Sequence, residues 1–198
     1  MQKRFGSVLL AGAFLASTLA PVRAQGTRPA THKATSFIDV AITYDATHAD
    51  VIPSSSFWMQ GGSVQLHGRF YGGLGAVADV AGMHIANINS TGVGLDIVTA
   101  AFGPRYTWSP ARARNAVFAQ GLVGVAHGFN GVFPFRNGVQ TAASSLAAQA
   151  GGGVNVNLSP RVALRAFEVN WLRTQLPNST NNAQNDVHFG AGIVFRFP

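Results

Sequence analysis

The chain has 198 residues, a formal net charge of +7 and no cysteine, so no disulfide can form. Only 11% of its residues are charged, whereas soluble domains average about 25%. The basic residues are scattered rather than gathered into the dense stripe of a nucleic-acid-binding surface, so no nucleic-acid partner is expected. Low charge and 23 glycines favour a protein whose outer surface meets lipid.

Residues 1–24 are predicted to be a cleaved secretory signal. Lys3 and Arg4 precede an uncharged, mostly apolar run at residues 5–20, and small residues stand at Val22 and Ala24. That run is shorter than the ~20 residues of a spanning helix. The mature protein is therefore expected to begin at Gln25. Residues 25–34 would be a short periplasmic lead-in, and residues 35–198 a single domain.

The first element of the mature chain is a segment whose residues alternate in polarity. One parity carries Ile38, Val40, Ile42 and Tyr44, and the other carries Phe37, Asp39, Ala41 and Thr43. Such alternation is typical of a strand with one face in lipid and the other in a polar lumen. No segment after the signal approaches the 18 or more consecutive apolar residues of a transmembrane helix.

Eight segments of this kind follow one another along the chain. They lie at about 36–45, 57–70, 74–85, 95–108, 116–127, 147–158, 162–174 and 187–197. Each has the length that a tilted strand needs to cross a bilayer. In the seventh segment Arg165 and Glu168 have opposite parity, so a β-bulge near Ala166 is needed to point both side chains inward.

The connections alternate between long and short, which is the layout of a membrane barrel. The long connections lie at 45–56, 86–94, 128–146 and 175–186, and the shorter ones at 71–73, 109–115 and 159–161. The predicted fold is all-β: a closed, eight-stranded, antiparallel, up-and-down transmembrane β-barrel. With an even number of strands, both termini fall on the short-turn side, which is the periplasm.

Aromatic residues gather at the two ends of the predicted strands, as in the interfacial girdles of membrane barrels. The short-turn ends carry Phe70, Tyr71, Tyr106, Trp108, Phe195 and Phe197, and the long-loop ends carry Tyr44, Phe57, Trp58 and Trp171. A general preference of aromatics for strands would not predict this clustering at the ends.

Several segments together resemble the outer-membrane β-barrel domain family, a group of small OmpA-like transmembrane barrels. They are FGPRY (102–106), FAQ (118–120), GGGV (151–154), ALR (163–165) and the closing FGAGIVFRF (189–197). The resemblance covers roughly residues 35–198. It implies an eight-stranded barrel in the outer membrane, inserted by the barrel assembly machinery, which reads a terminal aromatic. Here Pro198 follows Phe197, a small departure from the family pattern.

An eight-stranded barrel leaves an interior just wide enough for side chains, so charges that point inward must be paired. The candidate lumen network consists of Asp39, Asp79 and Glu168 with Arg105, Arg165 and Arg196. Asp79 and Arg105 lie on neighbouring predicted strands and are expected to pair. Two interpretations stay open: a polar plug that makes the barrel rigid, which we favour, and a narrow gated pore for ions or small solutes.

Enzymatic and metal-binding roles have little support in the sequence. The six histidines are far apart, none forms the spaced pair of a zinc helix, and no cysteine could assist, so neither metal nor cofactor is expected. No histidine stands two residues before a serine, as in lipid A deacylase barrels, and no G-x-S-x-G elbow occurs. No catalytic residue is assigned. A lipid-modifying enzyme remains the less favoured alternative, and a soluble ligand-binding barrel would need the opposite facing of its residues.

The function predicted is that of an integral outer-membrane protein, expected to be a monomer in outer-membrane lipid, with a structural or surface-interaction role. Any ligand would be met by the long extracellular loops, since binding residues concentrate on loops. Phe129, Phe133 and Phe135 give the loop at 128–146 an unusual aromatic density. They would either contact a partner or the outer leaflet, or fold over the barrel mouth and be buried.

Overall fold

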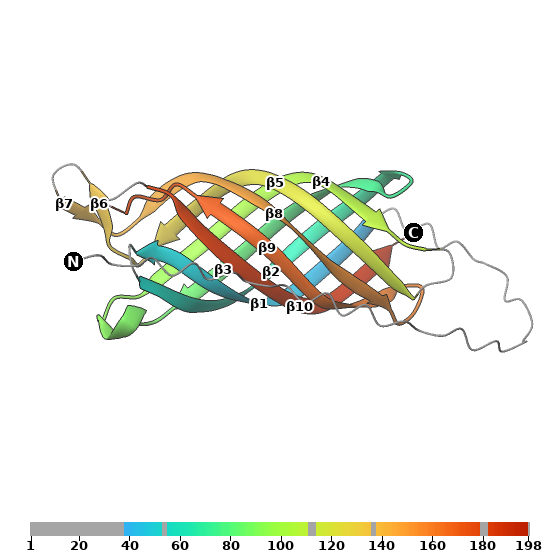
Figure 1. Ribbon diagram of the computed structural model, residues 1–198, viewed down its shortest axis with the longest axis horizontal. Helices are drawn as coiled ribbons and strands as arrows, with labels where there is room; N and C mark the ends of the chain where they lie inside the picture. The colour runs from blue at the N-terminus through green and yellow to red at the C-terminus, as the bar shows by residue number, and fades with distance from the viewer. Residues whose placement is uncertain (1–37, 53–54, 111–113, 136–137, 179–181, 198) are drawn as a thin grey trace, which may run out of the picture. The chain divides into compact units, whose positions relative to one another are not determined.

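The computed structural model describes residues 38–52, 55–110, 114–135, 138–178 and 182–197. The predicted signal at 1–24 and the lead-in at 25–34 lie outside these residues. The described chain forms one closed antiparallel barrel in which the strands neighbour one another in the order β1-β10-β9-β8-β5-β4-β3-β2. Figure 1 shows the tilted strands wrapping around a single axis. The predicted eight-stranded up-and-down barrel is confirmed.

The barrel strands agree with the predicted segments, and most of them extend further at the long-loop end. They are β1 (Ile38–Ile52), β2 (Ser55–Tyr71), β3 (Leu74–Ile85), β4 (Leu95–Trp108), β5 (Asn115–Phe129), β8 (Ala143–Asn157), β9 (Val162–Thr174) and β10 (Gln184–Phe197). The largest difference concerns residues 45–56, which were predicted to be a loop. Most of them continue the ladder between β1 and β2, where Thr47 pairs with Met59 and Ala49 with Phe57.

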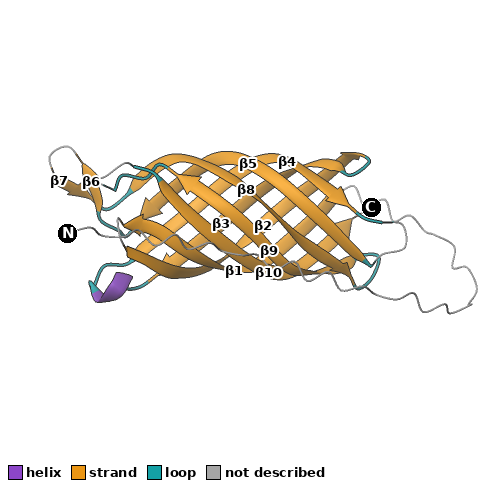
Figure 2. Ribbon diagram, viewed as in Figure 1, coloured by secondary structure: helices purple, strands orange, loops and turns teal. Residues whose placement is uncertain are grey.

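Two long connections carry structure of their own. A 3-10 turn, η1 (Ile88–Ser90), lies between β3 and β4, and a small hairpin of β6 (Phe133–Phe135) and β7 (Gly138–Gln140) lies between β5 and β8. Figure 2 shows both additions at the same end of the barrel, away from the short turns. The long-loop end is therefore the structurally elaborated end.

The predicted bulge in β9 is present. Glu168 pairs with Gly190 of β10 and Arg165 pairs with Gly192, so two β9 residues stand where β10 has one. The register with β8 shifts at the same place. Ala166 and Phe167 consequently both face outward, while Arg165 and Glu168 are both buried. The extra residue is what points both charges into the lumen.

The outer face of the barrel is apolar. Exposed Val, Leu, Ile and aromatic side chains occur on every barrel strand, including Val64, Val80, Phe102, Val123 and Ile193. Most aromatics predicted at the strand ends are exposed there, for example Tyr71 at 85% and Trp58 at 55%. Phe57 is the exception, because its side chain turns inward and is 5% exposed. None of the helical structure in the described residues is long and apolar enough to cross a membrane.

Candidate functional site

The middle of the barrel is filled by a polar network that we call the lumen layer: Gln65, Asp79, Arg105, Gln120, Arg165, Glu168 and Asn170. Its centre is an ion pair between Arg165 Nη1 and Glu168 Oε2 at 2.6 Å. The two side chains are only 1% and 3% exposed. The bulge in β9 places both on the inner face of one strand, three residues apart. Two of the predicted network residues are thus joined directly.

Arg105 of β4 is held by amide oxygens rather than by a carboxylate. Its guanidinium donates to Gln120 Oε1 and, at 2.5 Å, to Gln65 Oε1. Arg165 donates to the same Gln65 oxygen at 2.5 Å. The two guanidinium groups also lie over the ring of Phe118, at 4.4 and 4.7 Å from its centroid. The ring and the shared oxygen let two cations sit close together inside the barrel.

The two glutamine amides complete the layer. Gln65 Nε2 donates to Glu168 at 2.9 Å, and Gln120 Nε2 donates to Glu168 at 3.0 Å and to Asn170 at 3.1 Å. Each amide accepts from an arginine and donates toward the carboxylate. Strands β2, β4, β5 and β9 are therefore tied together across the barrel. Gln65 was not in the predicted network, although its inward parity on β2 was available as a signal.

The predicted contact between Asp79 and Arg105 is wrong. No ion pair within 4 Å joins them among the described residues. Asp79 stands opposite Ala101 of β4, whereas Arg105 stands opposite Gly75. Gln65 is the direct cross-strand neighbour of Asp79, and its side-chain oxygen accepts the hydrogen bond from the Arg105 guanidinium instead. The Oδ1 atom of Asp79 is buried and has no hydrogen-bond partner in the described protein.

Asp39 and Arg196 belong to a separate group at the short-turn end. They are direct cross-strand neighbours on β1 and β10. Asp39 Oδ2 lies 3.4 Å from His67 Nδ1 and 3.9 Å from Arg69 Nη2, and Arg196 donates to Asn157 at 2.7 Å. The six predicted charges therefore form two levels rather than one network. His67 and Arg69 were missed because the alternation in the second predicted strand is irregular.

A small cavity lies beside the lumen layer. Asp45, Asp79, Glu168 and His188 are among the residues that line it, and its volume is about 10 Å³. That is about the space for one water molecule. His188 is 8% exposed and lies inside the lumen, beside this cavity.

The lumen changes character at the long-loop end. A mouth cluster of buried apolar residues fills it, consisting of Ala49, Phe57, Met59, Ala81, Met83, Ile88, Leu95, Ile97, Phe133, Ala143 and Leu176. It joins barrel strands to the η1 turn and to the β6 segment. The mouth is thus closed by hydrophobic packing, whereas the middle is closed by hydrogen bonds and charge.

The three loop phenylalanines have different fates. Phe133 is 2% exposed and belongs to the mouth cluster, so it does fold over the barrel opening. Phe135 is 65% exposed and is free to meet a partner. Phe129 is partly buried, and its ring stacks on His127 with 5.9 Å between centroids. The two interpretations of this loop each hold for part of it.

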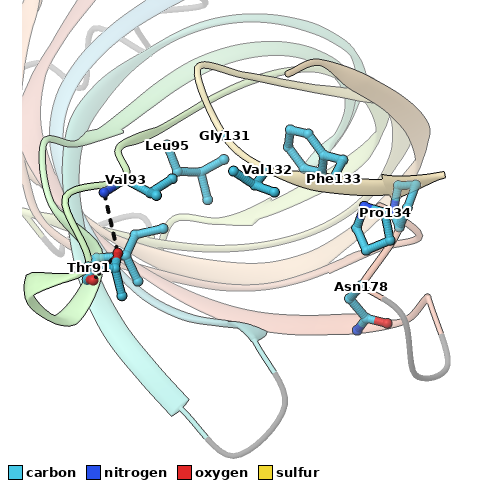
Figure 3. A pocket seen from close by; sticks show the side chains of 10 residues that line it. Thr91, Val93, Leu95, Gly131, Val132, Phe133, Pro134 and Asn178 are labelled. Carbon is cyan, nitrogen blue, oxygen red and sulfur yellow. Dashed lines mark hydrogen bonds between the residues drawn. The ribbon is translucent and has the colours of Figure 1, made fainter. Parts of the chain in front are cut away.

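A mouth pocket of about 370 Å³ lies among the long loops. It is lined by Ile88, Thr91, Val93, Leu95, Gly131, Val132, Phe133, Pro134, Pro177 and Asn178. Figure 3 shows Thr91, Val93 and Leu95 on one side and the segment from Gly131 to Pro134 facing them. The connections β3–β4, β5–β8 and β9–β10 all contribute. No single segment of the sequence could have signalled this pocket.

One serine–histidine pair lies at the long-loop end, on the outside of the barrel. Ser144 Oγ is 2.7 Å from His127 Nδ1, and both side chains are exposed. A nucleophilic triad also needs a group that orients the imidazole. Among the described residues, no hydrogen bond from a third side chain orients this imidazole, and no set of three His, Cys, Asp or Glu residues could hold a metal ion.

The closed barrel with an apolar outside and a polar inside defines a transmembrane β-barrel. Among solved structures, Neisserial surface protein A is similar, with a TM-score of 0.64 and 14% identity over 82% of this chain and 98% of that one. Ail, the attachment invasion locus protein of Yersinia pestis, is also similar, with a TM-score of 0.56 and 14% identity over 81% and 97%. The complex of Ail with the heparin analogue sucrose octasulfate gives 0.55 and 16%, over 81% and 97%.

The chain therefore has the fold of the small outer-membrane β-barrels. At these identities the likeness establishes the fold and not a shared function. No family model matches the chain, and no curated protein matches it. The barrel that the sequence resemblance implied is thus supported by architecture.

Proposed function

We propose that the protein is an integral outer-membrane barrel, monomeric in lipid, with a closed lumen and a surface-interaction role carried by its long loops. The observation that carries this proposal is the facing of its side chains. The belt of exposed apolar residues suits the hydrocarbon of a bilayer, and the inward charges are paired or hydrogen-bonded. A soluble barrel would face its residues the other way.

A closed lumen is favoured over a gated pore. The lumen layer spans four strands, its centre is an ion pair that is almost fully buried, and the cavity beside it has room for about one water molecule. Opening a conduit would require breaking these contacts, and separating Arg165 from Glu168 would leave two buried charges without partners. We therefore expect no stepwise conductance in planar bilayers, and a steady conducting state would favour the pore instead.

The long loops are proposed to face the outside medium and the short turns the periplasm, with both termini on the periplasmic side after signal cleavage and insertion by the barrel assembly machinery. Ail is named the attachment invasion locus protein, and a contact role for this loop end would be comparable. Phe135, an exposed apolar residue on these loops, supports a contact surface there.

The native chain has no cysteine, so single-cysteine variants test this orientation cleanly. Val139 on β7 is 71% exposed, and Pro160 is exposed in the short turn between β8 and β9. A membrane-impermeant maleimide should label Val139→Cys in intact cells. It should label Pro160→Cys only after the outer membrane is permeabilised. The reverse pattern, or equal labelling of both, would contradict the proposal.

A further inference from the structure

We propose that the mouth pocket binds the uncharged, wholly apolar portion of a small molecule from the outside medium, either an alkyl chain or an aromatic ring system. This inference rests on the proposed function for the outward facing of the loops, and it adds the chemical class of the ligand. The pocket volume of about 370 Å³ falls within the usual range of small-molecule sites, about 300–1,000 Å³.

The polar side chains in the lining are already engaged within the loops. Thr91 Oγ1 donates to the carbonyl of Ile88 at 2.7 Å and accepts from the amide of Val93 at 3.3 Å. Asn178 Oδ1 accepts from the amide of Asn182 at 2.9 Å, and the backbone amide of Asn178 donates to Asn182 Oδ1 at 3.1 Å. A ligand would therefore find few free hydrogen-bonding groups on these two side chains.

The absence of charge in the pocket lining also favours an uncharged, apolar ligand. None of the ten lining residues is ionisable. A charged group brought into this pocket would lose hydration without gaining a partner, which is costly. An apolar group would instead exchange water for Val132, Val93 and the prolines. The pocket therefore complements a neutral ligand and discriminates against a charged one.

The floor of the mouth pocket is preformed, because the residues that build it are held in place by packing. Ile88, Leu95 and Phe133 line the pocket and also belong to the buried mouth cluster, with exposures of 6%, 3% and 2%. Their positions are fixed by packing against the barrel. Val132, in contrast, is 56% exposed and contributes to the wall without being part of that core. A substitution at Val132 can thus alter the pocket while leaving the core intact.

The test uses two fluorescent probes that differ by one sulfonate group. N-phenyl-1-naphthylamine is neutral, and 8-anilino-1-naphthalenesulfonate is its anionic counterpart. Both would be titrated onto the full chain in detergent-free lipid nanodiscs, with empty discs as the blank. We expect saturable binding of the neutral probe at one site per chain, and binding of the anionic probe at least about tenfold weaker, because its sulfonate must be desolvated.

The matched variants are Val132→Asp and Val139→Asp, since both valines are exposed residues of the same long connection and only Val132 lines the pocket. Val132→Asp should weaken the neutral probe about tenfold or more, whereas Val139→Asp should leave it unchanged. Equal effects of the two variants, tighter binding of the anionic probe, or no saturable binding would overturn the proposal.

Two further readouts separate the possible failures. Repeating the titration in discs of shorter-chain lipid should give the same affinity, and an affinity that follows lipid chain length would assign the pocket to a membrane lipid and overturn the choice of a soluble ligand. The cysteine labelling at Val139 is independent of any ligand. Surface labelling without Val132-dependent binding would overturn this inference alone, and absent surface labelling would overturn the proposed function.

Discussion

The lumen layer and the mouth cluster close the same barrel by different physical means. In the lumen layer Glu168 accepts hydrogen bonds from four side chains, those of Arg165, Gln65, Gln120 and Asn170. The stability of this layer therefore depends on the direction of each hydrogen bond and on the identity of each partner. In the mouth cluster Met59, Met83, Leu95 and Phe133 pack without such demands. The comparison teaches that the middle should tolerate almost no substitution, while the mouth should tolerate changes that keep apolar volume.

The largest expected effect comes from deleting a single residue on one side of the β9 bulge. When Val169 is deleted and Asn170 keeps its inward position, β9 becomes a regular strand without the bulge. In that strand the side chain of Glu168 points outward and the side chain of Phe167 points inward. The free energy of unfolding should fall by at least about 3–5 kcal/mol, because Arg165 is left buried without its partner. Urea unfolding in lipid vesicles measures this.

Deletion of Ala166 is the control for that variant. It removes the bulge, yet Arg165 and Glu168 keep a common inward parity, so the loss should be clearly smaller. Similar losses for the two deletions would show that the bulge does not determine which way the charges face.

Replacing Arg165 by methionine should produce the next largest effect. The side chain is 1% exposed and pairs with Glu168, so its removal leaves a buried carboxylate short of a cation. The expected loss is about 3–5 kcal/mol of unfolding free energy. Arg173→Met on the same strand alters an exposed side chain and should change stability little. A double variant with Glu168→Gln should cost less than the sum of the single changes, and strict additivity would argue against coupling.

In the mouth cluster, Met59→Leu should cost less than about 1.5 kcal/mol, even though Met59 is 1% exposed. The exchange keeps apolar volume and breaks no obligatory hydrogen bond. Thr47 Oγ1 contacts the neighbouring Met83 sulfur and is left in place. The same unfolding assay applies. A loss as large as that of Arg165→Met would remove the distinction between the two regions.

The smallest effect should have the opposite sign. Asp79→Asn removes a buried carboxylate whose Oδ1 atom has no hydrogen-bond partner in the described protein. Since a buried carboxylate with one unsatisfied oxygen is unfavourable, the variant should be more stable by about 1 kcal/mol. Asp45→Asn is a useful reference, because Asp45 is another buried carboxylate lining the same cavity. If Asp79→Asn instead lowered the free energy of unfolding by several kcal/mol, the result would support the pairing of Asp79 with Arg105 that the sequence predicted.

The sequence predicted the barrel because the alternation of apolar and polar residues is a local property. The polarity of each residue indicates whether its side chain faces the lipid or the lumen. Parity alone also located the bulge at Ala166, which is present. The partner of Asp79 was mispredicted because pairing depends on how far side chains reach across several strands. Gln65 intervenes from the other neighbouring strand, β2, and no local pattern encodes that. Phe57 was likewise assigned to the outside because the ladder between β1 and β2 continues into a segment that reads as a loop.

The mouth pocket lay beyond sequence reasoning for a related reason. Its walls come from Val93, Val132 and Pro177, which belong to three different connections. Loop composition indicated a contact surface at this end and gave no means of bringing those residues together. The burial of Phe133 was one of two alternatives, and choosing between them required knowing that the barrel interior offers an apolar level at its mouth.

The ion pair of the lumen layer has a consequence for how the barrel is assembled. Arg165 and Glu168 belong to one strand, so they can neutralise each other before β9 has found either neighbour. A pair recruited from distant strands would expose two separate charges to the membrane until the barrel closed. Here the strand carries its own counter-charge, so we expect a lower cost of bringing this stretch into a bilayer than for a pair recruited from two distant strands.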